Sequence, residues 1–209
     1  MNSNLAEEHL QTIRLLMERS ALYRRALAPI MLVAGILGVV AAAIGLRFHV
    51  ESAKAFAGLW MGTACVALTL AFVLARRQAL KDHEPFWSPP TCRVAQALFP
   101  PLLCGLFAGG LLALMADSWG VDFPMLLAWL LFYGCALHAA GFFMARGIKW
   151  FGWIFIAGAV LLMISIHAAG YEITPWAANW LMGFFFGLLH LGYGGYLYFT
   201  ENSRNRSAA

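Results

Sequence analysis

Long apolar stretches separated by short polar segments set the pattern of this chain. Six apolar runs occur, and none has an Asp, Glu, Lys or Arg residue in its interior. A helix of about 20 apolar residues spans the hydrocarbon core of a bilayer. The pattern therefore predicts six membrane-spanning helices, at about residues 26–46, 55–75, 98–116, 123–145, 150–169 and 179–199.

The composition agrees with this interpretation. Hydrophobic residues make up 62% of the chain and charged residues 11%, whereas a soluble domain has about 25% charged residues. Too few polar side chains remain to cover a soluble domain, but lipid can face the surplus apolar surface. The net charge is +4. Because the basic residues flank the apolar runs and form no patch, the charge does not indicate nucleic-acid binding.

The positions of the basic residues predict the orientation of the spans. Of the 14 Lys and Arg residues, all but Arg47 and Lys54 lie before the first run, after the sixth, or in alternate connecting segments between them. Basic residues are retained on the cytoplasmic side of a membrane. We therefore expect a multi-pass protein of the cell (inner) membrane with both termini in the cytoplasm.

The predicted fold is an all-α bundle of six transmembrane helices, built from three helical hairpins and covering residues 26–199. Residues 200–209 are expected to form a disordered cytoplasmic tail. Residues 1–25 form a separate cytoplasmic segment, in which apolar residues of 4–25 recur at helical spacing. This spacing is typical of an amphipathic helix that lies on a membrane or docks on a protein. The residues predicted to contact the bilayer surface or a partner are Leu10, Ile13, Met17, Arg24 and Arg25.

The segment "IRLLMERSALYRRALAP" (13–29) resembles a family of uncharacterised bacterial six-span membrane proteins. That family has a similar Ile-Arg-x-Leu-Met-Glu-Arg-Ser segment before its first span. The segments "LLFYGCALHAAGFFMARGIKWFG" (130–152) and "LMGFFFGLLHLGYGGYLY" (181–198) are similar to its later helices, so the resemblance covers most of the chain. It implies a six-span fold and carries no catalytic role.

Small residues recur on single faces of the predicted third, fourth and sixth helices. Small side chains let membrane helices approach one another closely, and polar side chains on such faces form hydrogen bonds across the gap. The glycines predicted to pack against neighbouring helices are Gly105, Gly109, Gly134, Gly141, Gly183, Gly187 and Gly194.

His138 and His190 lie inside the fourth and sixth runs, each on a face of small residues. Both are expected to face protein rather than lipid. In one interpretation each is neutral and bonded to a carbonyl or hydroxyl of a neighbouring helix. In another, the two histidines ligate a haem, or Cys104, Cys135 and His138 hold a soft metal. In a third they line a proton or substrate path, although such paths usually recruit Asp or Glu.

The sequence contains no recognisable catalytic machinery. Ser165, in "LMISIHAAG", lacks the Gly-x-Ser-x-Gly turn of serine hydrolases. His49 and His83 fall in connecting segments and receive no role. The leading interpretation is a non-enzymatic membrane component that acts through a protein partner bound at residues 4–25, without a cofactor. The alternative is a carrier, either of a haem or metal cofactor at His138 and His190 or of a small, mostly apolar solute.

Overall fold

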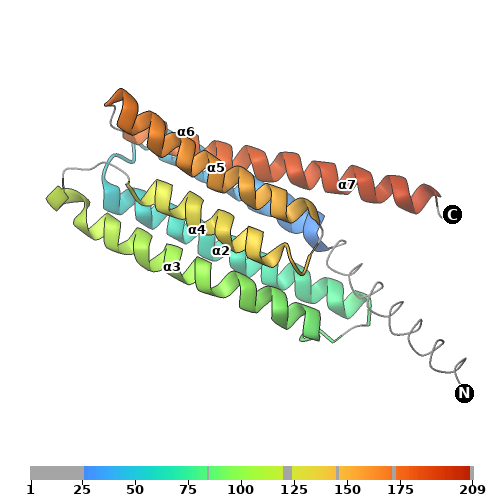
Figure 1. Cartoon of the computed structure of the whole chain (residues 1–209). Helices are drawn as coiled ribbons and strands as arrows, with labels where there is room; N and C mark the ends of the chain where they lie inside the picture. Colours follow the sequence, from blue (N-terminus) through green and yellow to red (C-terminus); the bar gives the residue numbers. More distant parts are fainter. Residues whose placement is uncertain (1–25, 84, 120–123, 145, 171–172, 208–209) are drawn as a thin grey trace, which may run out of the picture.

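The computed structural model describes residues 26–83, 85–119, 124–144, 146–170 and 173–207, and all regular structure in these ranges is helical. The predicted helix at 4–25 lies outside the described residues. The first described helix is Ala26–Arg47. It is followed by α2 (Ala53–Lys81), α3 (Pro89–Trp119), α4 (Pro124–Ala140), α5 (Arg146–Ala169), α6 (Pro175–Met182), the π-helix η1 (Gly183–Leu188) and α7 (Leu189–Ser207) (Figure 1).

Four of the described helices are long and apolar enough to cross a membrane. They are Ala26–Arg47, α2, the segment Thr91–Met115 of α3 and the segment Gly147–Ala169 of α5. Helix α4 is apolar but shorter, with 17 residues. Helices α6, η1 and α7 follow one another without a gap in the chain, so the sixth apolar run forms one helical rod in three segments.

Several helices extend past the apolar runs that predict them. Helix α2 ends at Lys81 and α3 begins at Pro89, because a helical backbone continues through polar flanks that hydropathy excludes. Helix α7 continues to Ser207, so residues 200–207 are helical where a disordered tail is expected. Helix α4 instead ends at Ala140, before the expected position 145, where the chain enters a turn at Gly141.

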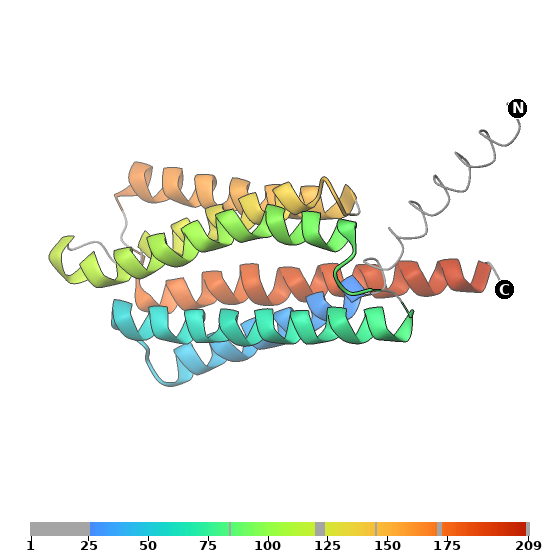
Figure 2. The same cartoon turned by 90° about the horizontal axis from the view of Figure 1, so that it is seen from below.

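The helices run side by side in an elongated bundle (Figures 1 and 2). The start of the Ala26–Arg47 helix (blue) and the end of α7 (red) lie at the same end of the bundle, which we call the terminal end (Figure 1). The connection from Ala26–Arg47 to α2, the end of α5 and the start of α6 lie at the opposite end, the loop end (Figure 1). The described chain therefore enters and leaves the bundle at one end.

The first helix and the last helical rod pack against each other through glycine, along an interface that we call the glycine seam. A Cβ atom added at any of six glycines would come within 3.0 Å of an atom across this interface, and in most cases of a backbone atom. Only glycine permits this approach without a shift of the partner helix. The six are Gly35, Gly38 and Gly45 on the first helix and Gly183, Gly187 and Gly194 on the rod.

The other predicted packing glycines also lie against neighbouring helices. Gly134 of α4 and Gly141 in the turn after α4 approach the backbone of α5, at Gly152 and Lys149. On α3, Gly105 and Gly109 lie against Phe132 and Trp129 of α4, and the Trp129 indole Nε1 donates a hydrogen bond to the Gly105 carbonyl oxygen at 3.1 Å. Gly58 and Gly62 of α2 differ, because a Cβ atom at either would meet nothing within 4 Å.

Candidate functional site

His190 is the polar centre of the bundle. Its side chain is 1% exposed. The ring nitrogen Nε2 lies 2.6 Å from the Tyr133 hydroxyl oxygen, and Nδ1 lies 3.1 Å from the Phe185 carbonyl oxygen. A carbonyl oxygen can only accept a hydrogen bond, so we assign the ring proton to Nδ1. Nε2 then accepts the Tyr133 hydroxyl proton, and both nitrogens of a neutral imidazole are satisfied.

The π-helix η1 accounts for the bond from His190 to Phe185. Amide hydrogen bonds in a π-helix span five residues instead of four, and the Leu189 amide N–H donates to the Phe184 carbonyl in this way. The helical register is thus shifted immediately before His190. In this arrangement the Phe185 carbonyl accepts a bond from a side chain five residues further along the same rod.

Aromatic rings enclose His190 on several sides. Ring centroids lie 5.5 Å away for Tyr133, 5.1 Å for Phe151, 5.6 Å for Phe155 and 6.0 Å for Phe186. These rings come from α4, α5 and η1, so the cluster joins the last helical rod to the α4–α5 pair. Because a buried polar group without a partner is costly, the two hydrogen bonds of His190 favour one arrangement of these helices.

His138 lies in a different aromatic cluster. Its ring makes edge contacts with Phe142 and Trp153, both at 5.4 Å between centroids. Among the described residues this cluster shares no ring with the cluster around His190. The Nδ1 atom of His138 is buried and has no hydrogen-bond partner. The two histidines are thus not arranged as a facing pair.

The cysteines predicted as soft-metal ligands are not gathered around His138. Cys104 is exposed and Cys135 partly exposed, and both are free thiols. Within the described ranges, no group of three or more His, Cys, Asp or Glu side chains is placed to hold a metal ion. The structure therefore does not assemble Cys104, Cys135 and His138 into a three-ligand site.

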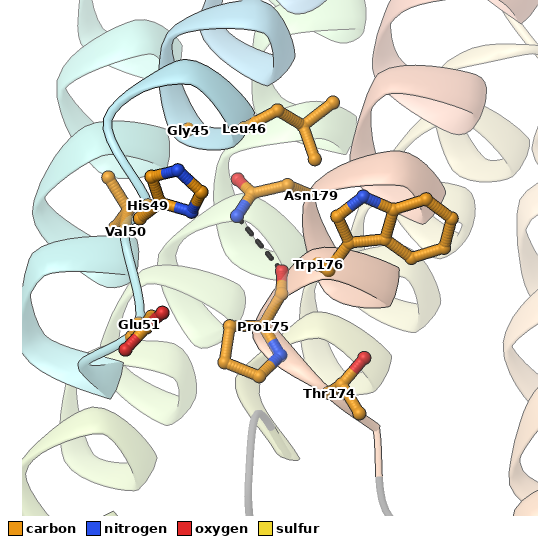
Figure 3. A pocket seen from close by; sticks show the side chains of 9 residues that line it. All are labelled: Gly45, Leu46, His49, Val50, Glu51, Thr174, Pro175, Trp176 and Asn179. Atoms are coloured by element: carbon orange, nitrogen blue, oxygen red, sulfur yellow. Dashed lines mark hydrogen bonds between the residues drawn. The ribbon is translucent and has the colours of Figure 1, made fainter.

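A small cavity of about 120 Å³ lies at the loop end, between the end of the first helix and the start of α6 (Figure 3). Its wall includes Asn179, which is 1% exposed. The Asn179 Oδ1 atom accepts a hydrogen bond from the Trp60 indole at 3.3 Å, and Nδ2 donates to the Pro175 carbonyl oxygen at 3.0 Å. The other lining residues are Gly45, Leu46, His49, Val50, Glu51, Thr174, Pro175 and Trp176.

Reasoning from the sequence missed three of these polar residues. Tyr133 was one aromatic residue among many in an apolar run, and only packing between helices identifies it as the partner of His190. Asn179 stands at the start of the sixth run, where an amide inside an apolar segment is an available signal. The sequence predicts that His49 lies in a connecting segment and gives no sign that it lines a cavity.

Comparison of the chain with family models, curated proteins and solved structures returned no match. The resemblance to bacterial six-span proteins therefore stays a prediction. Functional inference for this chain rests on its own geometry.

Proposed function

We propose that this protein is a six-span protein of the bacterial cell membrane, with both termini in the cytoplasm, and that it acts as a non-enzymatic component through a protein partner. Four helices are long and apolar enough to cross a membrane, and α4 and the α6–η1–α7 rod would supply the other two crossings. The entry and exit of the described chain at one end (Figure 1) support an even number of crossings. The basic flanks support a cytoplasmic terminal end.

The observation that carries the non-enzymatic part is the bonding of His190. Both of its ring nitrogens are engaged by Tyr133 and Phe185. Ligation of a metal through either nitrogen would break one of these bonds and leave a buried polar group unpaired. This geometry favours a histidine that holds helices together over one that binds a cofactor.

One observation favours the alternative, a carrier of a haem or soft metal. The Nδ1 atom of His138 is buried and has no hydrogen-bond partner, so a ligand could engage it without breaking a protein hydrogen bond. Visible absorbance of the purified protein separates the two proposals. A Soret band that disappears in His138→Gln would replace the first proposal by the second, whereas the first expects no such band.

Reporter fusions test the topology. Fusions at Ser118 and Pro175 are expected to report an outside location, and fusions at Asp82 and Ala209 a cytoplasmic one. These fusions sample the second, third and fifth connections between the proposed spans and the C-terminal end of the chain. One inverted reporter would remove the neighbouring span from the proposal.

Substitutions in the N-terminal segment test the partner. Ile13→Asp with Met17→Asp places two charges on the predicted apolar stripe, and we expect copurification of the partner after mild detergent extraction to fall while the protein still inserts. The matched control is Asn4→Asp with Gln11→Asp, which adds the same charge to the opposite helical face. Equal copurification in the two double variants would contradict docking through this stripe.

A further inference from the structure

The chain is positively charged where α4 turns into α5, at residues 138–153, which we call the α4–α5 corner. The corner includes Arg146 and Lys149, and no Asp or Glu occurs in the chain between Asp122 and Glu172. Both basic residues fall in the first turn of α5, where the helix end carries a partial positive charge and acidic residues are favoured. The corner therefore has a positive potential that its own hairpin does not neutralise.

Packing holds the Lys149 side chain in a defined position. Its stem lies across Gly141, because a Cβ atom added at Gly141 would come within 2.5 Å of the Lys149 Cγ atom. The ammonium nitrogen lies 3.5 Å from the centroid of the Phe142 ring, in a cation–π contact. Within the described ranges, no carboxylate forms an ion pair with Lys149. The ammonium group therefore has a fixed position and room for an anionic partner.

The His138 imidazole contacts the same Phe142 ring, at 5.4 Å between centroids. The side chain is partly exposed, whereas its Nδ1 atom is buried and has no hydrogen-bond partner. A proton on Nδ1 would be buried without an acceptor, so we assign the proton of the neutral ring to Nε2. Phe142 thus contacts both an ammonium group and an imidazole that can donate a hydrogen bond.

In the proposed membrane orientation, the α4–α5 corner lies at the depth of the lipid headgroups. The end of α4 and the start of α5 are at the terminal end (Figure 1), and Lys149 is the third residue of the apolar segment Gly147–Ala169. Four aromatic side chains of the corner are exposed: Phe142, Phe143, Trp150 and Trp153. Exposed aromatic rings, Trp above all, favour the boundary between headgroups and acyl chains. A lipid beside the corner can therefore place its headgroup at Lys149 and its chains against these rings.

We propose that the α4–α5 corner binds the phosphate group of an anionic phospholipid of the cytoplasmic leaflet. The Lys149 ammonium pairs with the phosphate charge, and the Nε2–H group of His138 donates a hydrogen bond to a phosphate oxygen. Basic sites between membrane helices on the cytoplasmic side bind anionic headgroups in this way. Phosphatidylcholine binds less well, because its own choline group neutralises the phosphate. The inference rests on the membrane insertion in the proposed function, and not on the protein partner.

Native mass spectrometry of the full-length protein in detergent tests the site, with phosphatidylglycerol and phosphatidylcholine offered in equal amounts. The wild type is expected to retain one phosphatidylglycerol per chain in preference to phosphatidylcholine. Lys149→Met keeps the stem and removes the charge, and it should lower this preference about fivefold, as expected for one basic residue beside anionic lipid. His138→Leu should lower it about two- to threefold through the loss of one hydrogen bond.

Lys81 provides the matched control, because it is an exposed basic residue at the end of α2, at the same end of the bundle (Figure 1). Lys81→Met removes the same charge outside the corner and should change the preference by less than about 1.5-fold, since solvent screens an exposed charge. The proposal is overturned if the wild type does not prefer phosphatidylglycerol, if Lys149→Met binds it like the wild type, or if both lysine variants lose the preference equally.

A competition arm distinguishes a lipid from free phosphate. Glycerol phosphate at the concentration of the lipid should leave the bound phosphatidylglycerol in place, because it lacks the acyl chains that contact the exposed rings. Displacement at that concentration would overturn the proposal, since the corner would then bind phosphate without a lipid. The reporter fusions test insertion without involving Lys149, so the two proposals can fail separately.

Discussion

His190 and His138 are the same residue type in two apolar helices, yet their surroundings differ. His190 is 1% exposed, is enclosed by aromatic rings and has a partner for each ring nitrogen. His138 lies at the edge of the α4–α5 pair between Phe142 and the half-exposed Trp153, and its buried Nδ1 atom has no partner. Two histidines in apolar helices of the same protein can therefore differ in whether their ring nitrogens have hydrogen-bond partners.

The difference follows from how closely the helices approach. The rod that carries His190 meets the first helix along the glycine seam and meets α5 through aromatic rings. His138 lies where α4 and α5 touch through Gly134 and Gly152, a contact between two backbones that leaves the imidazole at the margin. Helices that pack closely around the His190 imidazole supply its hydrogen-bond partners. At the edge of the α4–α5 contact, no such partner reaches Nδ1 of His138.

The largest expected effect is that of His190→Leu. This variant leaves the Tyr133 hydroxyl and the Phe185 carbonyl buried without their partner, and we expect the free energy of unfolding to fall by about 2–4 kcal/mol. His138→Leu breaks no observed hydrogen bond of Nδ1 and should cost less than about 1 kcal/mol. The free energy of unfolding of both variants is measured by detergent-induced unfolding of the protein in bicelles. Equal losses would show that the two histidines do not differ in the way described.

An intermediate effect is expected at the glycine seam. A Cβ atom on Gly38 would collide with the Phe186 carbonyl group, and Gly38→Ala should lower the free energy of unfolding by about 1–3 kcal/mol through overpacking. The matched variant Gly62→Ala has nothing within 4 Å of its new methyl group. It should be neutral or slightly stabilising, because Ala has the higher helix propensity. The same unfolding assay measures both variants. If Gly62→Ala lowers the free energy of unfolding as much as Gly38→Ala, close packing at the glycine seam is not what makes Gly38 necessary.

The smallest effects are expected around His138. His138→Gln keeps polar bonding capacity at a position whose Nδ1 has no partner, and Cys135→Ser keeps nearly the same volume on a partly exposed surface. Each should change the free energy of unfolding by less than about 0.5 kcal/mol. A loss above about 2 kcal/mol in either variant, measured in the same assay, would indicate a ligand or contact at this edge that packing does not explain.

The existence of the helices could be predicted from the sequence, because long apolar runs such as 26–46 and 150–169 indicate helices that are shielded from water by lipid or protein. Their ends could not, since hydropathy does not register the polar turns of α2 beyond position 75 or the turn that ends α4 at Ala140. The glycines of the sixth run could be predicted as small residues on one helical face. The seam glycines of the first helix, Gly35, Gly38 and Gly45, are not among the predicted packing positions, because pairing of helices leaves no periodic signal.

The site was less predictable than the fold. His190 could be identified as inward-facing, but its bond to Tyr133 joins residues 57 positions apart. Its bond to Phe185 depends on a π turn within "GFFFGL" that hydropathy does not reveal. The cavity beside His49 depends on a left-handed residue at a helix end, where sequence patterns usually predict glycine.

A double-mutant cycle on Tyr133 and His190 tests the central claim most directly. The free energy of unfolding is measured for the wild type, Tyr133→Phe, His190→Leu and the double variant. If the imidazole ties α4 to the last rod, Tyr133→Phe should cost at least about 1 kcal/mol more in the wild type than in the His190→Leu background, where the hydroxyl has already lost its partner. Additive losses, within about 0.3 kcal/mol, would show that the two side chains are not coupled and would contradict a structural role for His190.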